Sequence, residues 1–102
     1  MNGPSFVPNK GKDSELYQRM IENTLGQLNA TNQMIGAVKA QADEHEAAGD
    51  MEKYQANEHL VMHLDLKAML QLNVIASYEG AKQQAIANEY YEANSRRILT
   101  LR

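Results

Sequence analysis

HLDLKAMLQLNVIA, residues 63–76, decides the fold, because it can be interpreted as a strand or as a helix. Every even-numbered residue from Leu64 to Val74 is apolar and most residues between them are polar, which is the alternation of a half-buried strand. However, no turn-forming residues border the stretch, and its Leu, Met, Ala, Gln and Lys residues favour a helix. We therefore expect a helix and interpret the alternation as accidental.

The composition of the whole chain also favours helices. The 102 residues are 43% apolar and 23% charged, the mixture of an ordinary globular protein, and the length predicts one folded domain. Pro4 and Pro8 are the only prolines, and both lie near the N-terminus. The prediction is an all-α fold with an extended N-terminal arm at 1–12 and a helical hairpin domain at 13–102.

A soft heptad pattern predicts the first helix at about 14–47. Two series of residues, each spaced by seven and offset from each other by three, form one seam along such a helix. Asp13 is the expected N-cap, with Glu15 in the first turn. The seam residues are Ile21, Leu28, Ile35 and Ala42 in the first series and Tyr17, Thr24, Thr31, Val38 and His45 in the second.

The segment EAAGDMEKY, residues 46–54, predicts a tight turn between two helices. Gly49 suits the left-handed position that follows a helix C-terminus, and Asp50 suits the N-cap of the next helix. Short connections of this kind join antiparallel neighbours. The second helix is therefore predicted at about 51–99.

The second helix is apolar on more of its circumference than the first helix can cover. At 100° per residue, a second group of apolar residues lies opposite the arc that would face the first helix. A helix that is apolar on most sides is a buried helix, so a second copy of the chain is the expected cover. The arc consists of Leu60, Val61, Leu64, Ala68, Leu72 and Ile75, the opposite group of Met62, Leu66, Met69 and Leu70, and a third strip of His63, Lys67 and Gln71.

A fold at residue 48 leaves everything from about residue 83 onward beyond the first helix. This overhang is rich in aliphatic side chains, and burying each one is worth about 1.5–3 kcal/mol. Either the helix breaks at Gly80 and a third helix folds back, or the overhang packs on other subunits. Because a single glycine is tolerated inside a helix, we expect a continuous or kinked helix and an oligomer.

The sharpest candidate for chemistry is the pair His59 and His63, which lie one helical turn apart and could bind Zn²⁺ or Ni²⁺. No third ligand is fixed by the sequence, and Glu58 is on the wrong side of His59 for the metalloprotease motif. The chain has no cysteine, glycine-rich phosphate loop or triad signature, and its acidic turn lacks calcium-loop spacing. We predict no enzyme activity, no metal and no cofactor.

The charge is acidic at 43–52 and basic at both ends of the chain, with a net charge of −3. This mild net charge predicts no nucleic-acid partner. Tyr90 and Tyr91 with Arg96 and Arg97 could clamp a single strand, but Tyr and Arg are more typical of protein interfaces. The absence of cysteine suits a cytoplasmic or virion protein, which is the location we expect. No apolar run spans a membrane, and the first residues do not have the pattern of a secretory signal.

The plan of a basic arm, a helical hairpin and an oligomer resembles the small helical subunits of secretion needles and of tailed-phage virions. The resemblance implies a structural or assembly subunit of a multi-protein complex, and a small bacteriophage virion component is the form we expect. The alternative is a soluble regulatory binder, such as a phage-encoded inhibitor or a secretion chaperone, that holds a partner helix. Expected partners are copies of the chain or other protein subunits. The predicted interface residues are Phe6, Val7, Met62, Leu66, Met69, Leu70, Ile86, Tyr90, Tyr91, Arg96, Arg97, Ile98, Leu99 and Leu101.

Overall fold

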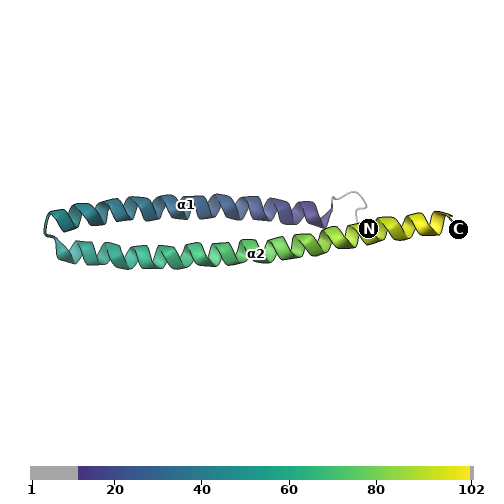
Figure 1. Ribbon diagram of the computed structural model, residues 1–102. Helices are drawn as coiled ribbons and strands as arrows, with labels where there is room; N and C mark the ends of the chain where they lie inside the picture. Colours follow the sequence, from purple (N-terminus) through teal and green to yellow (C-terminus); the bar gives the residue numbers. More distant parts are fainter. Residues whose placement is uncertain (1–11, 102) are drawn as a thin grey trace, which may run out of the picture. The chain divides into compact units, whose positions relative to one another are not determined.

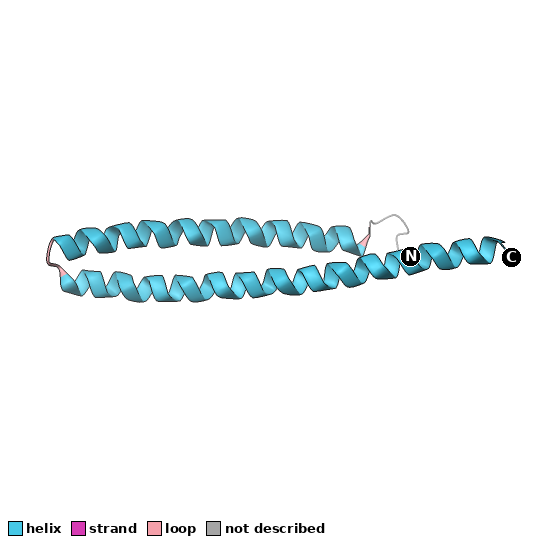
Figure 2. Cartoon of the chain, in the orientation of Figure 1, coloured by secondary structure: helices cyan, strands magenta, loops and turns pink. Residues whose placement is uncertain are grey.

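The computed structural model describes the backbone of residues 12–101 and the side chains of residues 12–95. Within this range the chain is all-α, with α1 at Asp13–Ala47, α2 at Met51–Leu101 and no strand (Figures 1 and 2). The stretch 63–76 lies inside α2, so the prediction of a helix there is confirmed. Apart from Lys12, the predicted arm at 1–12 lies outside the described residues.

The two helices pack as an antiparallel hairpin, and the chain divides into two compact units that each contain part of both helices. We call residues 23–75 the turn unit. The described residues of the other unit, 12–22 and 76–101, form the terminal unit. The predicted pair of long helices is therefore confirmed.

The turn between the helices has the predicted geometry. Gly49 has φ 77°, the left-handed conformation that a side chain would strain. The N–H of Asp50 donates to the carbonyl of His45 at 2.9 Å and the N–H of Gly49 donates to the carbonyl of Glu46 at 3.0 Å, which together close α1 as a Schellman motif. Asp50 then caps α2, because its carboxylate accepts the N–H of Lys53 at 3.3 Å.

The heptad seam predicted for α1 is the face that packs on α2. Every residue of the two predicted series is buried or half-buried, including Thr24 and Thr31. The hydroxyl of Thr31 donates to the carbonyl of Gln27 at 3.1 Å, which satisfies a polar group inside this apolar seam.

The matching seam of α2 follows a strict alternation of three and four residues. Its centre is the core cluster of Val38, Val61 and Leu64, with Ile35 packed against it. Polar residues occupy several seam positions, so the two helices bury a thin core. The α2 seam consists of Tyr54, Asn57, Val61, Leu64, Ala68, Gln71 and Ile75 in the turn unit and Tyr78, Lys82, Ala85 and Glu89 in the terminal unit.

The predicted apolar arc of α2 was too wide. Leu60 and Leu72 were expected to face α1 but are exposed, while Gln71, expected on a third strip, is half-buried in the seam. The reason is geometric, because two helices of a coiled coil share only a narrow strip at positions spaced by three and four. This strip reaches Gln71 and leaves Leu60 and Leu72 on its flanks.

The terminal unit begins with a cap that differs from the predicted one. The carbonyl of Lys12 accepts the N–H of Leu16 at 3.2 Å, so Lys12 occupies the N-cap position and Asp13 lies inside the first turn. A carboxylate from α2 caps this helix instead. The carboxylate of Glu89 accepts a hydrogen bond from the N–H of Ser14 at 3.1 Å and another from the hydroxyl of Ser14 at 2.9 Å.

The same unit shows that the pairing runs farther along α2 than the sequence suggested. Lys82 donates to the side-chain oxygen of Gln18 at 2.6 Å, Ala85 is buried, and Glu89 contacts Ser14. The expectation that everything from about residue 83 overhangs is therefore wrong. α2 continues unbroken through Gly80, which confirms the continuous helix.

Candidate protein-interaction face

Four large apolar side chains form an exposed stripe on α2 in the turn unit. Met62, Leu66, Met69 and Leu70 are 63%, 57%, 59% and 63% exposed. Their spacing of four, three and one places them on one face of a helix. We call these four residues the outer stripe. The sequence predicted all four as interface residues, and the turn unit leaves all four uncovered.

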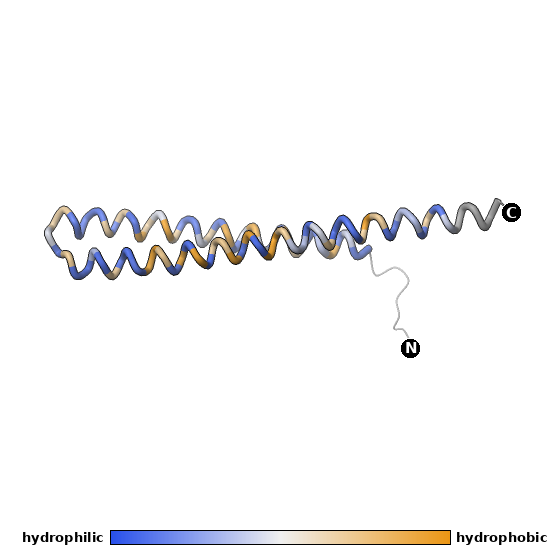
Figure 3. The backbone as a smooth tube through the Cα atoms, turned by 60° about the horizontal axis from the view of Figure 1, so that its bottom comes forward, coloured by the Kyte–Doolittle hydropathy of each residue, from blue (hydrophilic) through white to orange (hydrophobic). Residues whose placement is uncertain are grey.

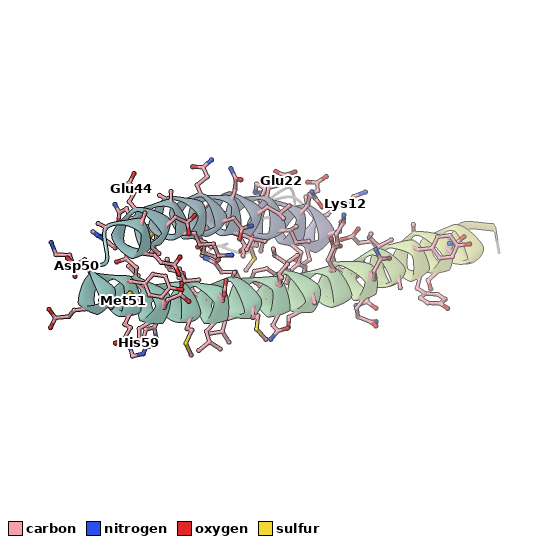
Figure 4. All side chains as sticks on the ribbon, turned by 60° about the vertical axis from the view of Figure 1, so that its left-hand side comes forward. Lys12, Glu22, Glu44, Asp50, Met51 and His59 are labelled. Carbon is pink, nitrogen blue, oxygen red and sulfur yellow. The ribbon has the colours of Figure 1, made fainter. Side chains whose placement is uncertain are left out.

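The outer stripe lies on the side of α2 that faces away from α1. Leu66 is two residues from the seam residues Leu64 and Ala68, which places it about 160° around the helix from each. In Figure 3 the apolar colour is strongest along the middle of α2, and Figure 4 shows His59 directed away from α1. The seam that builds the hairpin therefore directs a second apolar face outward.

A shallow groove accompanies the stripe, lined by His59, Met62, His63 and Leu66. The two imidazoles lie one turn apart, as predicted. Among the described residues no group of three or more His, Cys, Asp and Glu side chains could hold a metal ion. The chemistry that this surface offers is apolar contact, with imidazole groups at one end.

The terminal unit carries a smaller exposed group. Ile86, Tyr90 and Tyr91 are all exposed, and the rings of Tyr90 and Tyr91 meet edge to face with centroids 6.0 Å apart. Aromatic residues on a surface suit protein contacts. The other predicted interface side chains, Phe6, Val7, Arg96, Arg97, Ile98, Leu99 and Leu101, lie outside the described side chains.

The electrostatics of the turn unit are dominated by acids around the turn. Glu44 and Asp50 lie at this end of the hairpin in Figure 4. The carboxylate of Glu58 raises the pKa of Tyr54 above its ordinary value of 10.0, with smaller contributions from Glu46, partial burial and Asp43. Several carboxylates around the turn therefore act on this one phenol.

An open groove beside the start of α1 was not predicted from the sequence. Lys12, immediately before α1, and Asp13 and Tyr17 of α1 line one side of it, and Ala85 and Glu89 are among its lining residues on α2. Glu89, one of its lining residues, also accepts a hydrogen bond from Ser14, which is 75 residues away in the chain. A contact over that separation has no local sequence pattern, so periodicity could not reveal it.

Comparisons with protein-family models, curated proteins and solved structures give no match for this chain. Over the described residues, α1 and α2 contain no segment with the length and hydropathy of a membrane span.

Proposed function

We propose that the chain is a non-catalytic structural or assembly subunit of a multi-protein complex. The observation that supports this most is the outer stripe, because four neighbouring large apolar side chains remain exposed while few large apolar side chains of the described seam are fully buried. Exposed apolar patches of this kind mark protein interaction sites. The specific form we propose, from the resemblance in plan, is a small bacteriophage virion component.

The thin seam strengthens the proposal. Ile21 and Leu64 are the only large apolar side chains that are buried within the described residues, and polar residues such as Thr24 and Thr31 share the seam with them. A small domain with little buried apolar surface gains stability by associating with other chains. Covering the outer stripe supplies the burial that the hairpin lacks.

The test is the native mass of Leu66→Glu, measured by light scattering and native mass spectrometry. A charge at the centre of the stripe should reduce the purified wild-type oligomer to a monomer, because a buried unpaired carboxylate is costly. The control, Gln33→Glu, adds the same charge at an exposed position on α1 and should keep the wild-type mass. A wild-type chain that is monomeric at high concentration contradicts the proposal.

A second candidate is a soluble regulatory binder that holds one partner helix on the outer stripe. The groove at His59, Met62, His63 and Leu66 favours it, because residues spaced by three and four along one helix present a surface suited to one further helix. The same mass measurement separates the two. A large homo-oligomer supports the assembly subunit, whereas a small species that takes up a different protein supports the binder.

A further inference from the structure

We propose that the outer stripe binds the outer stripe of a second copy, with the two α2 helices parallel and in register about Leu66. This inference rests on the proposed function and names the partner of its candidate face. Leu66 lies at the centre of the stripe, with Met62 before it and Met69 and Leu70 after it. A two-fold axis is the commonest symmetry of homo-oligomers, and it would place Leu66 on Leu66 of the other copy.

Charge decides the direction of the second helix. Asp65 and Lys67 are the neighbours of Leu66 in sequence, so they lie about 100° to either side of it, on opposite flanks of the stripe. Both are exposed, and within the part of the chain that the structure describes neither forms an ion pair. The carboxylate and the ammonium group are therefore available to a partner.

A parallel pair brings these opposite charges together. When the two-fold axis runs along the helices, the Asp65 flank of one copy lies beside the Lys67 flank of the other, and this happens twice. When the helices are antiparallel, the axis brings each flank onto its own counterpart, so Asp65 faces Asp65 and Lys67 faces Lys67. Like charges disfavour that pairing, so the parallel arrangement is preferred.

Two residues that lie beyond the outer stripe, one before it and one after it, also favour this register. His59 and Asn73 lie seven residues before and after Leu66, so both continue the line of Leu66 along the helix. In a parallel pair in register, His59 lies opposite His59 of the other copy, and Asn73 lies opposite Asn73 of the other copy. A polar Asn at a central position of a coiled coil favours partners in which a second Asn lies opposite, and this fixes register.

Cross-linking tests the arrangement, because the chain contains no cysteine. Asn73→Cys and His59→Cys are made separately in the full chain and oxidised. A parallel pair in register brings each new thiol to its own copy, within the Cα separation of about 4.4–6.8 Å that a disulfide requires, so each variant should form a covalent dimer alone. Gln33→Cys, on the exposed side of α1, should stay uncross-linked.

The possible results separate this inference from the proposed function. If only a mixture of Asn73→Cys and His59→Cys cross-links, the helices are antiparallel and the inference is wrong. If the wild type is an oligomer and the two variants cross-link neither alone nor when mixed, the stripe is not the contact between copies, although the assembly function stands. If the wild type is a monomer, both are wrong.

Charge exchange gives a second measurement that does not depend on thiol chemistry. Asp65→Lys should weaken self-association by about tenfold, because it places two lysines together at each flank. The double variant Asp65→Lys with Lys67→Asp should restore it. Circular dichroism verifies that both variants remain helical, and a double variant as weak as the single one contradicts the parallel arrangement.

Discussion

At the scale of single residues, Glu89 joins α2 to the start of α1 within the terminal unit. Its carboxylate accepts both the N–H and the hydroxyl of Ser14 at the start of α1, where unpaired N–H groups and the helix dipole favour a negative charge. We predict that Glu89→Ala lowers the free energy of unfolding by about 1 kcal/mol and frays the first turn of α1. Hydrogen exchange of the amides of residues 13–16 measures the fraying.

The matched control is Glu79→Ala, which removes the same side chain from an exposed position on α2. It should change neither the stability nor the exchange in the first turn of α1. Equal protection of these amides in wild type and Glu89→Ala would show that the carboxylate does not cap α1.

At the scale of the elements, two glycines should respond oppositely to the same substitution. Gly49 has a positive φ in the turn, so Gly49→Ala should lower the free energy of unfolding by about 1 kcal/mol. Gly80 lies inside α2, where a Cβ would meet nothing within 4 Å, so Gly80→Ala should raise it by about 1 kcal/mol. Denaturant unfolding of both variants measures the difference, and a destabilised Gly80→Ala would indicate that α2 bends there.

The two seams show which parts of the helix packing can be predicted from hydrophobic periodicity. The seam of α1 could be predicted in full because its polar members, Thr24 and Thr31, lie between strongly apolar residues that set the period. The seam of α2 could not, because Leu60 and Leu72 lie beside it and match its chemistry better than Gln71, which lies within it. Hydrophobicity alone cannot select a narrow strip on a helix that is apolar on several sides.

The outer stripe could be predicted from the sequence although the α2 seam could not. Both outcomes arise because α2 carries more apolar residues than α1 can cover. Met62, Leu66, Met69 and Leu70 lie opposite the arc that was expected to face α1, so they were expected outside the hairpin, and all four are exposed. The cap at Ser14 and the groove beside it were not predictable, because they depend on how far two distant segments extend along each other. Helix propensity carries no information about that register.

At the scale of the whole molecule, charge is distributed unevenly along the sequence. Residues 43–52 carry five acids and no Lys or Arg, whereas residues 93–102 carry three arginines and no acid. In the turn unit four of these five acids are exposed, and Asp50 is half-buried. In an assembly, the turn of one copy can therefore attract the C-terminal segment of another.

This attraction predicts that assembly beyond the two-fold pair depends on salt. The range of an exposed charge falls from about 10 Å at 0.1 M to about 3 Å at 1 M ionic strength, while apolar contacts of the outer stripe are not screened. Native mass should fall to two copies as salt rises. Arg96→Gln with Arg97→Gln should cause the same fall at low salt, whereas Arg19→Gln with Lys39→Gln, which removes two charges from exposed positions of α1, should not. A mass that is unchanged by salt would mean that the acidic turn does not order the copies, and would leave apolar contacts as the sole basis of assembly.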